Sequence, residues 1–464
     1  MDLSFFKNRK ITVFGLGLHG GGVGVVKFLS EHGAKIVVTD LNPKEKLAAS
    51  LDKLKGLKNI QYVLGQHRRE DFTNADMVIK NPAIPWTDKH VKLALENKIP
   101  VEMDSSLFFK LCKNPIIGVT GTKGKTTSAT LIYEILKSAG KNPTKVGIGQ
   151  TSVLDKLLEL KKDSVVVFEL SSWRLSALGR AKLSPHIAVF KNIMRDHLNY
   201  YGTMEKYLAD KKYIFTNQKS KDWLIFNYDD QTVREIAKEA PSQTIKFSYE
   251  PLKRSRSVFI EDGYMYLNDG IDVLKLLATK DIPIPGHHNL SNVMAAVGAS
   301  FAYGVSPAAI KKALKQLNGV PHRLEFVRDF EEVKYYNDTA ATIPDAAMSA
   351  LDSFEQPIVL IAGGTDKNLD FADLGRAMIE KTKRFVLLKG TATDKLILEL
   401  QKDPENQVLD FDIVDSMEAA VKLARSLAEK GDVVVLSPGA ASFGLFANEF
   451  DRGDKFKEAV KKLK

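Results

Sequence analysis

Cysteine and long apolar runs are what this sequence of 464 residues most lacks. Cys112 is its single cysteine, and one thiol cannot form a disulfide within the chain, so a disulfide-stapled secreted fold is excluded. The opening residues show no apolar core of a signal segment, and the most apolar later stretch, NVMAAVGASFAYGV, is too short to span a bilayer. We therefore expect a cytoplasmic protein without a membrane partner.

Basic motifs interleaved with aromatic residues are also missing, although the formal net charge is +10. The lysines are spread through segments such as KEKLAASLDKLKGLK and KFKEAVKKLK, which is typical of solvated helix faces. We therefore expect no nucleic-acid partner. A positive surface can equally steer polyphosphate substrates.

Strand-like apolar runs alternate with helix-like segments along the chain, without a short-period repeat. Such alternation predicts parallel, doubly wound sheets, and the length exceeds what one hydrophobic core usually organises. We predict an α/β protein of three domains: a Rossmann-like N-terminal domain over residues 1–112, a central domain with a mainly parallel sheet over 113–319, and a Rossmann-like C-terminal domain over 320–464.

Glycines mark the first predicted strand-to-helix junction, which reads Gly15-Leu16-Gly17-Leu18-His19-Gly20, and Asp40 ends the next predicted strand. Glycines at such a junction let the backbone approach a phosphate at a helix N-terminus, and the carboxylate can bind a ribose hydroxyl. A dinucleotide cofactor and another nucleotide-linked ligand both fit this pattern.

The stretch GTKGKTTSAT follows the apolar run PIIGVT and precedes the helix-like LIYEILKSAG. In such a loop, backbone amides surround phosphates, a lysine reaches the terminal phosphates, and a hydroxyl at the helix start binds magnesium. The spacing departs from the general P-loop, because Val119 stands where its first glycine would fall. Strand, loop and helix still occur in the required order. We predict a P-loop-type ATPase domain that binds ATP with Mg²⁺ through Gly121, Thr122, Lys123, Gly124, Lys125, Thr126 and Thr127.

Polar residues follow two further predicted strands of the central block, at the edge where parallel sheets bind ligands. SVVVFEL ends in Glu169, which we predict to be a magnesium ligand, with Ser171 just beyond it. PHIAVFKNI leads to His197, which fits a ligand and an ordinary loop histidine equally well. In HHNLSN, Asn289 and Asn292 are typical of the start of a packed helix, although two asparagines one turn apart can also read an adenine edge.

Ten motifs are spaced along essentially the whole chain: GLGL, NPAIP, GTKGKTT, ELSSW, NIMRDHLNYYGTMEKYLADKKYIF, HHNLSN, PHRLE, NDTAAT, GGTDKN and SPGAASFGLFANEFDRGDKF. In this order they resemble the Mur ligase family of peptidoglycan synthesis, specifically its glutamate-adding branch. The resemblance implies that ATP phosphorylates the carboxylate of UDP-N-acetylmuramoyl-L-alanine and that the amino group of glutamate attacks the acyl phosphate. Such chemistry needs positive charge around crowded oxyanions, which two magnesium ions and lysines would supply.

The resemblance also implies the catalytic residues. Lys125 matches the phosphate-binding lysine, and Thr126 and Glu169 match ligands of the first metal ion. His197 would lie near the second metal ion, and Lys211 matches a lysine that the family carries as a carbamate. An ammonium group cannot bind magnesium, whereas a carbamate offers oxygen donors.

The resemblance implies further residues that bind the nucleotide, the UDP substrate or the incoming glutamate. The nucleotide would be held by Asn289, Asn292, Arg323 and Asp338, and the UDP part of the substrate by Gly17, Leu18, His19 and Asp40, with Ser171 as a further substrate contact. The incoming glutamate would meet Thr342, Lys367 and Ser442 of the third block. Because the phosphate loop lies in the second block, the reaction would require domain closure that excludes water from the acyl phosphate.

Four positions depart from the usual pattern of the family. Ile148 replaces an asparagine, Arg174 a glutamine, Ala340 a lysine, and Glu449 a phenylalanine. They border the predicted UDP-substrate and amino-acid pockets rather than the metal centre. D-glutamate is the usual acceptor of the family, and L-glutamate or another amino acid stays open. We expect a monomer.

Three other functions can be weighed against this one. A nicotinamide-dependent oxidoreductase explains the first block but leaves the phosphate loop and Glu169 without a task. A silent ATP-binding regulator is disfavoured, because Lys125, Glu169, His197 and Lys211 are all present. The alanine-adding Mur ligase, which also has a Rossmann-like first domain, is the nearest competitor.

Overall fold

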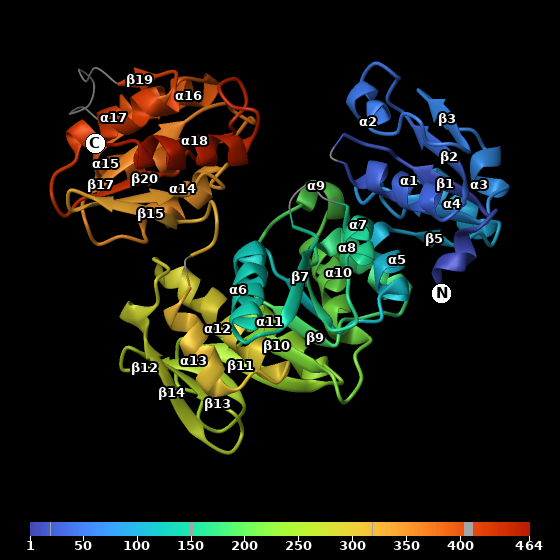
Figure 1. Ribbon diagram of the computed structural model, residues 1–464, viewed down its shortest axis with the longest axis horizontal. Helices are drawn as coiled ribbons and strands as arrows, with labels where there is room; N and C mark the ends of the chain where they lie inside the picture. Colours follow the sequence, from blue (N-terminus) through green and yellow to red (C-terminus); the bar gives the residue numbers. More distant parts are fainter. Residues whose placement is uncertain (19, 149–151, 318, 403–411) are drawn as a thin grey trace. The chain divides into compact units, whose positions relative to one another are not determined.

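The computed structural model describes residues 1–18, 20–148, 152–317, 319–402 and 412–464. These residues form two compact units, one of Met1–Leu277 with Ser291–Ala313 and the other of Ala278–Leu290 with Leu314–Lys464. Figure 1 shows a sheet in each of the blue, the green to yellow, and the orange to red parts of the chain. No helix of the described residues is long and apolar enough to cross a membrane.

The N-terminal sheet has the strand order β3-β2-β1-β4-β5, with every neighbouring pair parallel. Its inner strands are apolar runs that are buried almost throughout, as expected where helices cover both faces of a parallel sheet. The elements are η1 (Leu3–Phe6), β1 (Lys10–Phe14), α1 (Gly21–Glu31), β2 (Lys35–Asp40), α2 (Ala48–Asp52), β3 (Ile60–Leu64), α3 (Glu70–Thr73), β4 (Met77–Lys80), α4 (Lys89–Glu96), β5 (Val101–Glu102) and α5 (Asp104–Leu111).

The central sheet has the order β14-β13-β12-β11-β10-β9-β6-β8-β7 and is parallel from β7 to β12. A two-residue turn, Asp262-Gly263, has positive φ at both positions, which suits the tight hairpin that joins the antiparallel strands β12 and β13. The strands are β6 (Ile116–Thr120), β7 (Asn142–Val146), β8 (Ser164–Glu169), β9 (Ile187–Phe190), β10 (Trp223–Asn227), β11 (Gln243–Ser248), β12 (Ser257–Glu261), β13 (Tyr264–Asn268) and β14 (Val273–Ala278). The helices are α6 (Lys125–Ser138), α7 (Val153–Leu158), α8 (Ser172–Arg180), α9 (Leu198–Tyr201), α10 (Met204–Thr216), α11 (Gln231–Ile236), η2 (Ala237–Glu239), η3 (Thr279–Asp281), α12 (His287–Ala302) and α13 (Pro307–Lys315).

The C-terminal sheet has the order β15-β16-β20-β17-β18-β19 and is parallel except for the β15–β16 pair. Its apolar side chains pack into one cluster on each face. The elements are β15 (Glu325–Phe330), β16 (Val333–Asn337), α14 (Pro344–Leu351), β17 (Ile358–Gly363), α15 (Ala372–Lys381), β18 (Thr382–Leu388), α16 (Thr391–Leu400), β19 (Ile413–Val414), α17 (Met417–Leu427), β20 (Val433–Leu436) and α18 (Glu449–Lys461). The predicted α/β class with mainly parallel sheets is therefore confirmed, while the domain boundaries at 112 and 319 stay predictions.

Candidate active site

The predicted phosphate loop joins β6, which lies between β8 and β9, to the first turn of α6. Gly124 has φ +80, and a Cβ atom there would lie 2.3 Å from Oδ1 of Asn292. A Cβ atom on Gly121 would lie 2.7 Å from Cβ of Lys191. Both positions therefore require glycine, because the loop runs tightly against neighbouring side chains.

Asn192, which follows the end of β9, holds this loop in shape. Its Oδ1 accepts hydrogen bonds from the backbone N–H groups of Thr122 and Lys123, each at 2.9 Å. Its Nδ2 donates to the carbonyl oxygen of Lys123 at 3.2 Å. The sequence analysis did not predict this role for Asn192.

Lys125 and Thr126, the first residues of α6, point to different partners. The Nζ of Lys125 donates to the carbonyl oxygens of Gly121 and Thr122 at 3.1 and 2.9 Å, so the lysine folds over its own loop. The hydroxyl of Thr126 donates to Oε2 of Glu169 at 2.7 Å. Glu169 ends β8 directly beside β6, and the structure thus brings together two of the predicted metal ligands.

Lys211 lies on α10 with its side chain 1% exposed. Its Nζ donates to the carbonyl oxygen of Gly121 at 2.7 Å and lies 4.8 Å from the centre of the Tyr207 ring. Burial first, and then the charge of Lys125, lower the pKa of Lys211 well below its ordinary value. Burial therefore favours the uncharged form of this amine against the phosphate loop.

His197 immediately precedes α9 in a left-handed conformation, φ 51°, and its ring centre lies 5.1 Å from that of Trp173. Burial lowers the pKa of His197, and the charges of Lys211 and Lys125 act in the same direction. Asp196 opposes them, with Oδ2 at 3.6 Å from Nε2. The imidazole is consequently biased toward its neutral form, which is the form that binds metal ions.

The donor set decides whether magnesium fits these residues. Thr126 and Glu169 offer a hydroxyl and a carboxylate, the hard oxygen donors that Mg²⁺ prefers. Among the residues that the structure describes, no group of three or more histidine, cysteine, aspartate or glutamate side chains could hold a metal ion by itself. Magnesium at this position would therefore need further oxygen atoms, such as those of a phosphate or of a modified Lys211.

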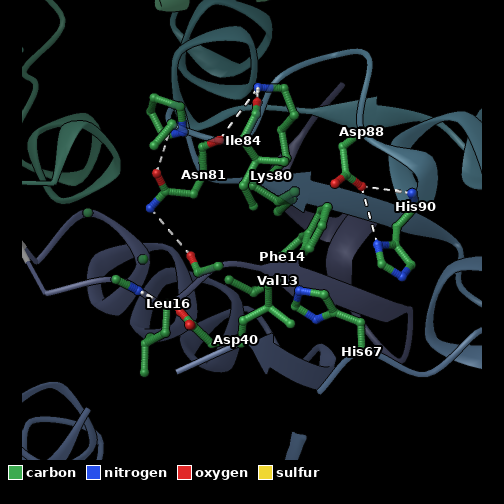
Figure 2. Close-up of a pocket in the computed structure, with 18 of the residues that line it drawn as sticks. Val13, Phe14, Leu16, Asp40, His67, Lys80, Asn81, Ile84, Asp88 and His90 are labelled. Atoms are coloured by element: carbon green, nitrogen blue, oxygen red, sulfur yellow. Dashed lines mark hydrogen bonds and ion pairs between the residues drawn. The ribbon is translucent and has the colours of Figure 1, made fainter. Parts of the chain in front are cut away.

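A cavity of about 1020 Å³ opens at the strand ends of the N-terminal sheet (Figure 2). Gly17 donates its backbone N–H to Oδ2 of Asp40 at 3.1 Å, and Oδ1 of the same carboxylate accepts from the N–H of Asn42 at 2.8 Å. Gly17, Leu18 and Asp40, which we predicted to hold the UDP part of the substrate, line this cavity together, whereas His19 lies outside the described residues.

Arg174 also lines this cavity, at one of the positions that depart from the family pattern. It donates to the carbonyl oxygens of Gly147 and Glu169 at 3.1 and 3.4 Å. Its guanidinium lies 3.7 Å from Oδ2 of Asp104, so the residue connects the central sheet to the first turn of α5. Ser171 caps α8 through the N–H of Arg174.

A buried lysine and a tryptophan that sequence reasoning missed lie beside the same cavity. Lys80, labelled in Figure 2, donates to the carbonyl oxygen of Ile84 at 2.8 Å, and burial lowers its pKa to about 7. The centre of the Trp86 ring lies 4.6 Å from Nζ of Lys80 and 4.3 Å from the guanidinium of Arg180. Its indole N–H donates to the hydroxyl of Ser176 on α8 at 2.7 Å.

The two predicted adenine-reading asparagines have different surroundings. Asn292 lies against the phosphate loop, and its Oδ1 accepts from the hydroxyl of Ser128 on α6 at 3.2 Å. Asn289 donates from Nδ2 to the carbonyl oxygen of Pro285 at 2.7 Å, which supports the start of its own helix. The helix-start reading thus applies to Asn289, and Asn292 adds a direct contact with the loop and α6.

In the C-terminal sheet, Asp338 is buried directly after β16. It accepts hydrogen bonds from the Ser437 hydroxyl at 2.8 Å and from the N–H of Leu324 at 3.1 Å. Burial raises the pKa of its carboxyl to about 7, although the charge of the exposed Arg323 acts in the opposite direction. The carboxyl is therefore poised between its acid and ionised forms near neutral pH.

The predicted acceptor residues are not joined by any contact that the described part of the structure shows. Thr342 is half-buried and Lys367 is exposed. The hydroxyl of Ser442 is buried without a hydrogen-bond partner among the described residues, so it has a vacant hydrogen-bonding position. Arg452, which sequence reasoning missed, is fully buried and donates to Thr339 and to the carbonyl oxygen of Ala440.

Comparison with known proteins gives the same class from three directions. Sequence profiles match the Mur ligase MurD-like N-terminal domain at residues 9–102, the Mur ligase middle domain at 119–300 and the glutamate ligase domain of Mur ligases at 322–439. The UDP-N-acetylmuramoylalanine--D-glutamate ligase of Roseiflexus sp. is 42% identical over 97% of this chain and 98% of its own length. The enzyme of that name from Clostridioides difficile is 37% identical over the full length of both chains.

A solved structure agrees in fold. The UDP-N-acetylmuramate-alanine ligase of Thermotoga maritima superposes with a TM-score of 0.57 at 19% identity and covers 98% of this chain and 100% of its own. The chain belongs to the Mur ligase family. Its predicted class, an ATP-dependent carbon–nitrogen ligase, is thereby confirmed, and an oxidoreductase is excluded.

Proposed function

We propose that this chain joins D-glutamate to UDP-N-acetylmuramoyl-L-alanine in an ATP-dependent reaction through an acyl phosphate. The observation that carries the proposal is the arrangement of a phosphate loop and the Thr126–Glu169 oxygen pair at neighbouring strand ends, with the buried Lys211 of α10 hydrogen-bonded to the loop. The name that the curated relatives share supplies the acceptor and its configuration.

In this proposal Lys125 changes partners when ATP binds. Its Nζ now donates to two carbonyl oxygens of its own loop, at 3.1 and 2.9 Å, and both are weaker partners than a phosphate oxyanion. Moving to the terminal phosphates would let the ammonium neutralise the charge that the transferred phosphoryl group spreads over its oxygen atoms.

Thr126 and Glu169 would hold the first magnesium ion, and His197 with Lys211 would hold the second. Bound magnesium would neutralise the oxyanions of the phosphate groups. Lys211 qualifies only after modification, because an amine held at the carbonyl of Gly121 offers no oxygen. In its uncharged form the Lys211 amine can attack CO₂, forming an N–C bond and releasing a proton, and the resulting carbamate carries two oxygen donors.

The UDP part of the substrate would occupy the cavity beside Gly17, Leu18, His19 and Asp40, with Ser171 as a further contact. Its volume of about 1020 Å³ suits a nucleotide-sized ligand. ATP would meet Asn289, Asn292, Arg323 and Asp338, and glutamate would meet Thr342, Lys367 and Ser442. The vacant hydrogen-bonding position on Ser442 supports the last assignment.

L-glutamate is the second candidate acceptor, because Glu449 and Ala340 place a carboxylate and a methyl group where the family usually has an aromatic ring and an amine. The alanine-adding activity has less support, since the curated relatives reported above are named for D-glutamate. We further propose that the chain acts in the cytoplasm as a monomer, without nucleic acid or membrane partners.

A substrate-omission assay tests the proposal. Release of ADP should require UDP-N-acetylmuramoyl-L-alanine and glutamate together, and Lys125→Ala should abolish it because the terminal phosphates lose their cation. A non-catalytic regulator would bind ATP and release no ADP under any combination of substrates. ADP release that is independent of the amino acid would refute ligation.

A further inference from the structure

Lys191 is a buried lysine to which the reaction described above gives no task. It follows the last residue of β9 directly and precedes Asn192, which holds the phosphate loop. Its side chain is only 1% exposed. A lysine is almost never fully buried without a specific partner, so its position calls for an explanation.

The aliphatic part of Lys191 runs along both glycines of the phosphate loop. A Cβ atom on Gly121 would lie 2.7 Å from Cβ of Lys191, and a Cβ atom on Gly124 would lie 3.4 Å from its Cε. The side chain thus spans the loop from its first glycine to its last, and its carbon atoms form one wall against which the loop packs.

The amine of Lys191 ends at the first turns of α12. Its Nζ is hydrogen-bonded to the hydroxyl of Ser291 at 2.7 Å and lies 4.9 Å from the centre of the Phe247 ring. Ser291 is followed by Asn292, whose Oδ1 touches Gly124 and accepts from the Ser128 hydroxyl. The single side chain of Lys191 therefore connects the phosphate loop to the helix that carries Asn292.

Charge neutralisation does not explain this lysine. The described residues offer it no carboxylate partner within ion-pair distance, and burial lowers the pKa of Lys191 well below its ordinary value. The hydrogen bond from Lys191 to the Ser291 hydroxyl therefore contributes geometry rather than charge pairing. The contribution of Lys191 is the distance that it fixes between the phosphate loop and α12.

We propose that Lys191 is a positioning residue for the nucleotide. Through Ser291 it sets the spacing between the phosphate loop and α12. The loop that binds the triphosphate and Asn292 on α12 are thereby held at a fixed distance from each other. This inference rests on the proposed function, because it assumes that the loop binds ATP and that Asn292 faces the nucleotide. It adds a residue and a hydrogen bond that the motifs did not single out.

A double-mutant cycle on nucleotide binding tests this role. Lys191→Met keeps the aliphatic wall and removes the amine, whereas Ser291→Ala removes the hydrogen bond from the other side. Each should raise the Kd for magnesium ADP about fivefold, the effect expected from the loss of one hydrogen bond. The double variant should bind ADP no more weakly than the single variants. The KM for ATP should rise by the same factor in turnover assays, with kcat and the KM for the UDP substrate unchanged. Lys221→Met, at an exposed lysine, is the matched control and should bind like the wild type.

The outcomes separate this role from a structural one. Replacing a buried amine by a thioether should leave the melting temperature unchanged or raise it, so loss of folding is not the expected route. A lower melting temperature with an unchanged Kd for ADP would overturn the proposal, as would additive effects in the double variant. A wild-type chain that binds no ADP would instead refute the proposed function, and the role of Lys191 with it.

Discussion

At the residue scale, the chemistry of the candidate site depends on how burial shifts the pKa values of side chains such as Lys211 and Asp338. The sequence predicted Lys125, Thr126, Glu169 and Lys211 from their motifs, and the structure gathers them around one loop. Lys191 was missed, because one lysine among many carries no signal of burial in a sequence. A possible signal was its place directly after an apolar strand, where Glu169 also stands.

Lys211 provides the first prediction. Lys211→Ala should lower kcat at least about a hundredfold, because the second magnesium ion loses its expected oxygen donors, and added acetate or formate should restore part of the rate. Lys212→Ala is the matched control, because Lys212 pairs with Glu239 instead of contacting the phosphate loop and should be dispensable. Steady-state kinetics with and without the carboxylate measure both effects. An unchanged rate in Lys211→Ala would remove this lysine from the mechanism.

Asp338 provides a prediction about pH. Its pKa is about 7 in the folded chain and about 4 in an unfolded one, so the folded state binds more protons between these values. Stability attributable to Asp338 is therefore present at low pH and is lost as the pH rises toward 7.

Asp338→Asn cannot ionise and should escape this loss. Its melting temperature relative to the wild type should rise between pH 5 and pH 8, by on the order of 4 °C. Thermal melts across this range measure the difference. A difference that stays constant with pH would show that the carboxyl does not titrate in the fold.

At the element scale, nucleotide binding by the phosphate loop depends on the close packing of its glycines against neighbouring side chains as much as on Lys125. Gly124→Ala should abolish measurable ADP binding, because the new methyl group would lie 2.3 Å from Oδ1 of Asn292 at a positive φ. Gly140→Ala is the matched control: its φ is also positive, +71, and no atom lies within 4 Å of the added Cβ. It should cost only about 1 kcal/mol of stability and bind ADP normally. Equal binding by both variants would contradict the packing argument.

The segment between β4 and α4 gives a second prediction at this scale. Trp86→Leu should weaken UDP binding about fivefold, because the ring fixes Lys80 beside the cavity and bonds to Ser176 on α8. Binding of ADP should not change, since the contacts of this ring in the described part of the chain are with Lys80, Ser176 and Arg180 rather than with the phosphate loop. Trp223→Leu, whose ring instead meets Arg256, is the control. Calorimetry with UDP measures both, and wild-type affinity in Trp86→Leu would exclude the ring from the substrate site.

The alternation of strands and helices predicted parallel sheets at the scale of elements, and the sheets have that form. The side-chain contacts between elements could not be predicted from the sequence. Nothing in NPAIPW shows that Trp86 would contact Lys80 and Arg180, and nothing in HHNLSN shows that Ser291 would meet Lys191. Such partners are far apart in the chain, and only the folded packing brings them together.

At the scale of the whole molecule, the predicted site residues are divided between the two compact units. The phosphate loop, Glu169, Lys211 and the cavity proposed for the UDP substrate belong to one unit, and Asp338 and the proposed glutamate residues to the other. The family resemblance, which rests on the order of ten motifs, predicted that the ATP and glutamate residues come from different domains. No single motif would have sufficed for this prediction. We expect the identity of the acceptor to depend on Ile148, Ala340 and Glu449, at which this chain departs from the usual pattern of the family.

Phosphate release from ATP and magnesium, measured with UDP-N-acetylmuramoyl-L-alanine and either D-glutamate or L-glutamate, tests the central claim most directly. We predict release with D-glutamate and little or none with L-glutamate, and none with either enantiomer in Lys125→Ala. Preference for L-glutamate would contradict the proposed acceptor and point to the altered pocket around Glu449. Silence with both enantiomers, in a wild-type chain that binds ATP, would contradict the proposed ligation itself.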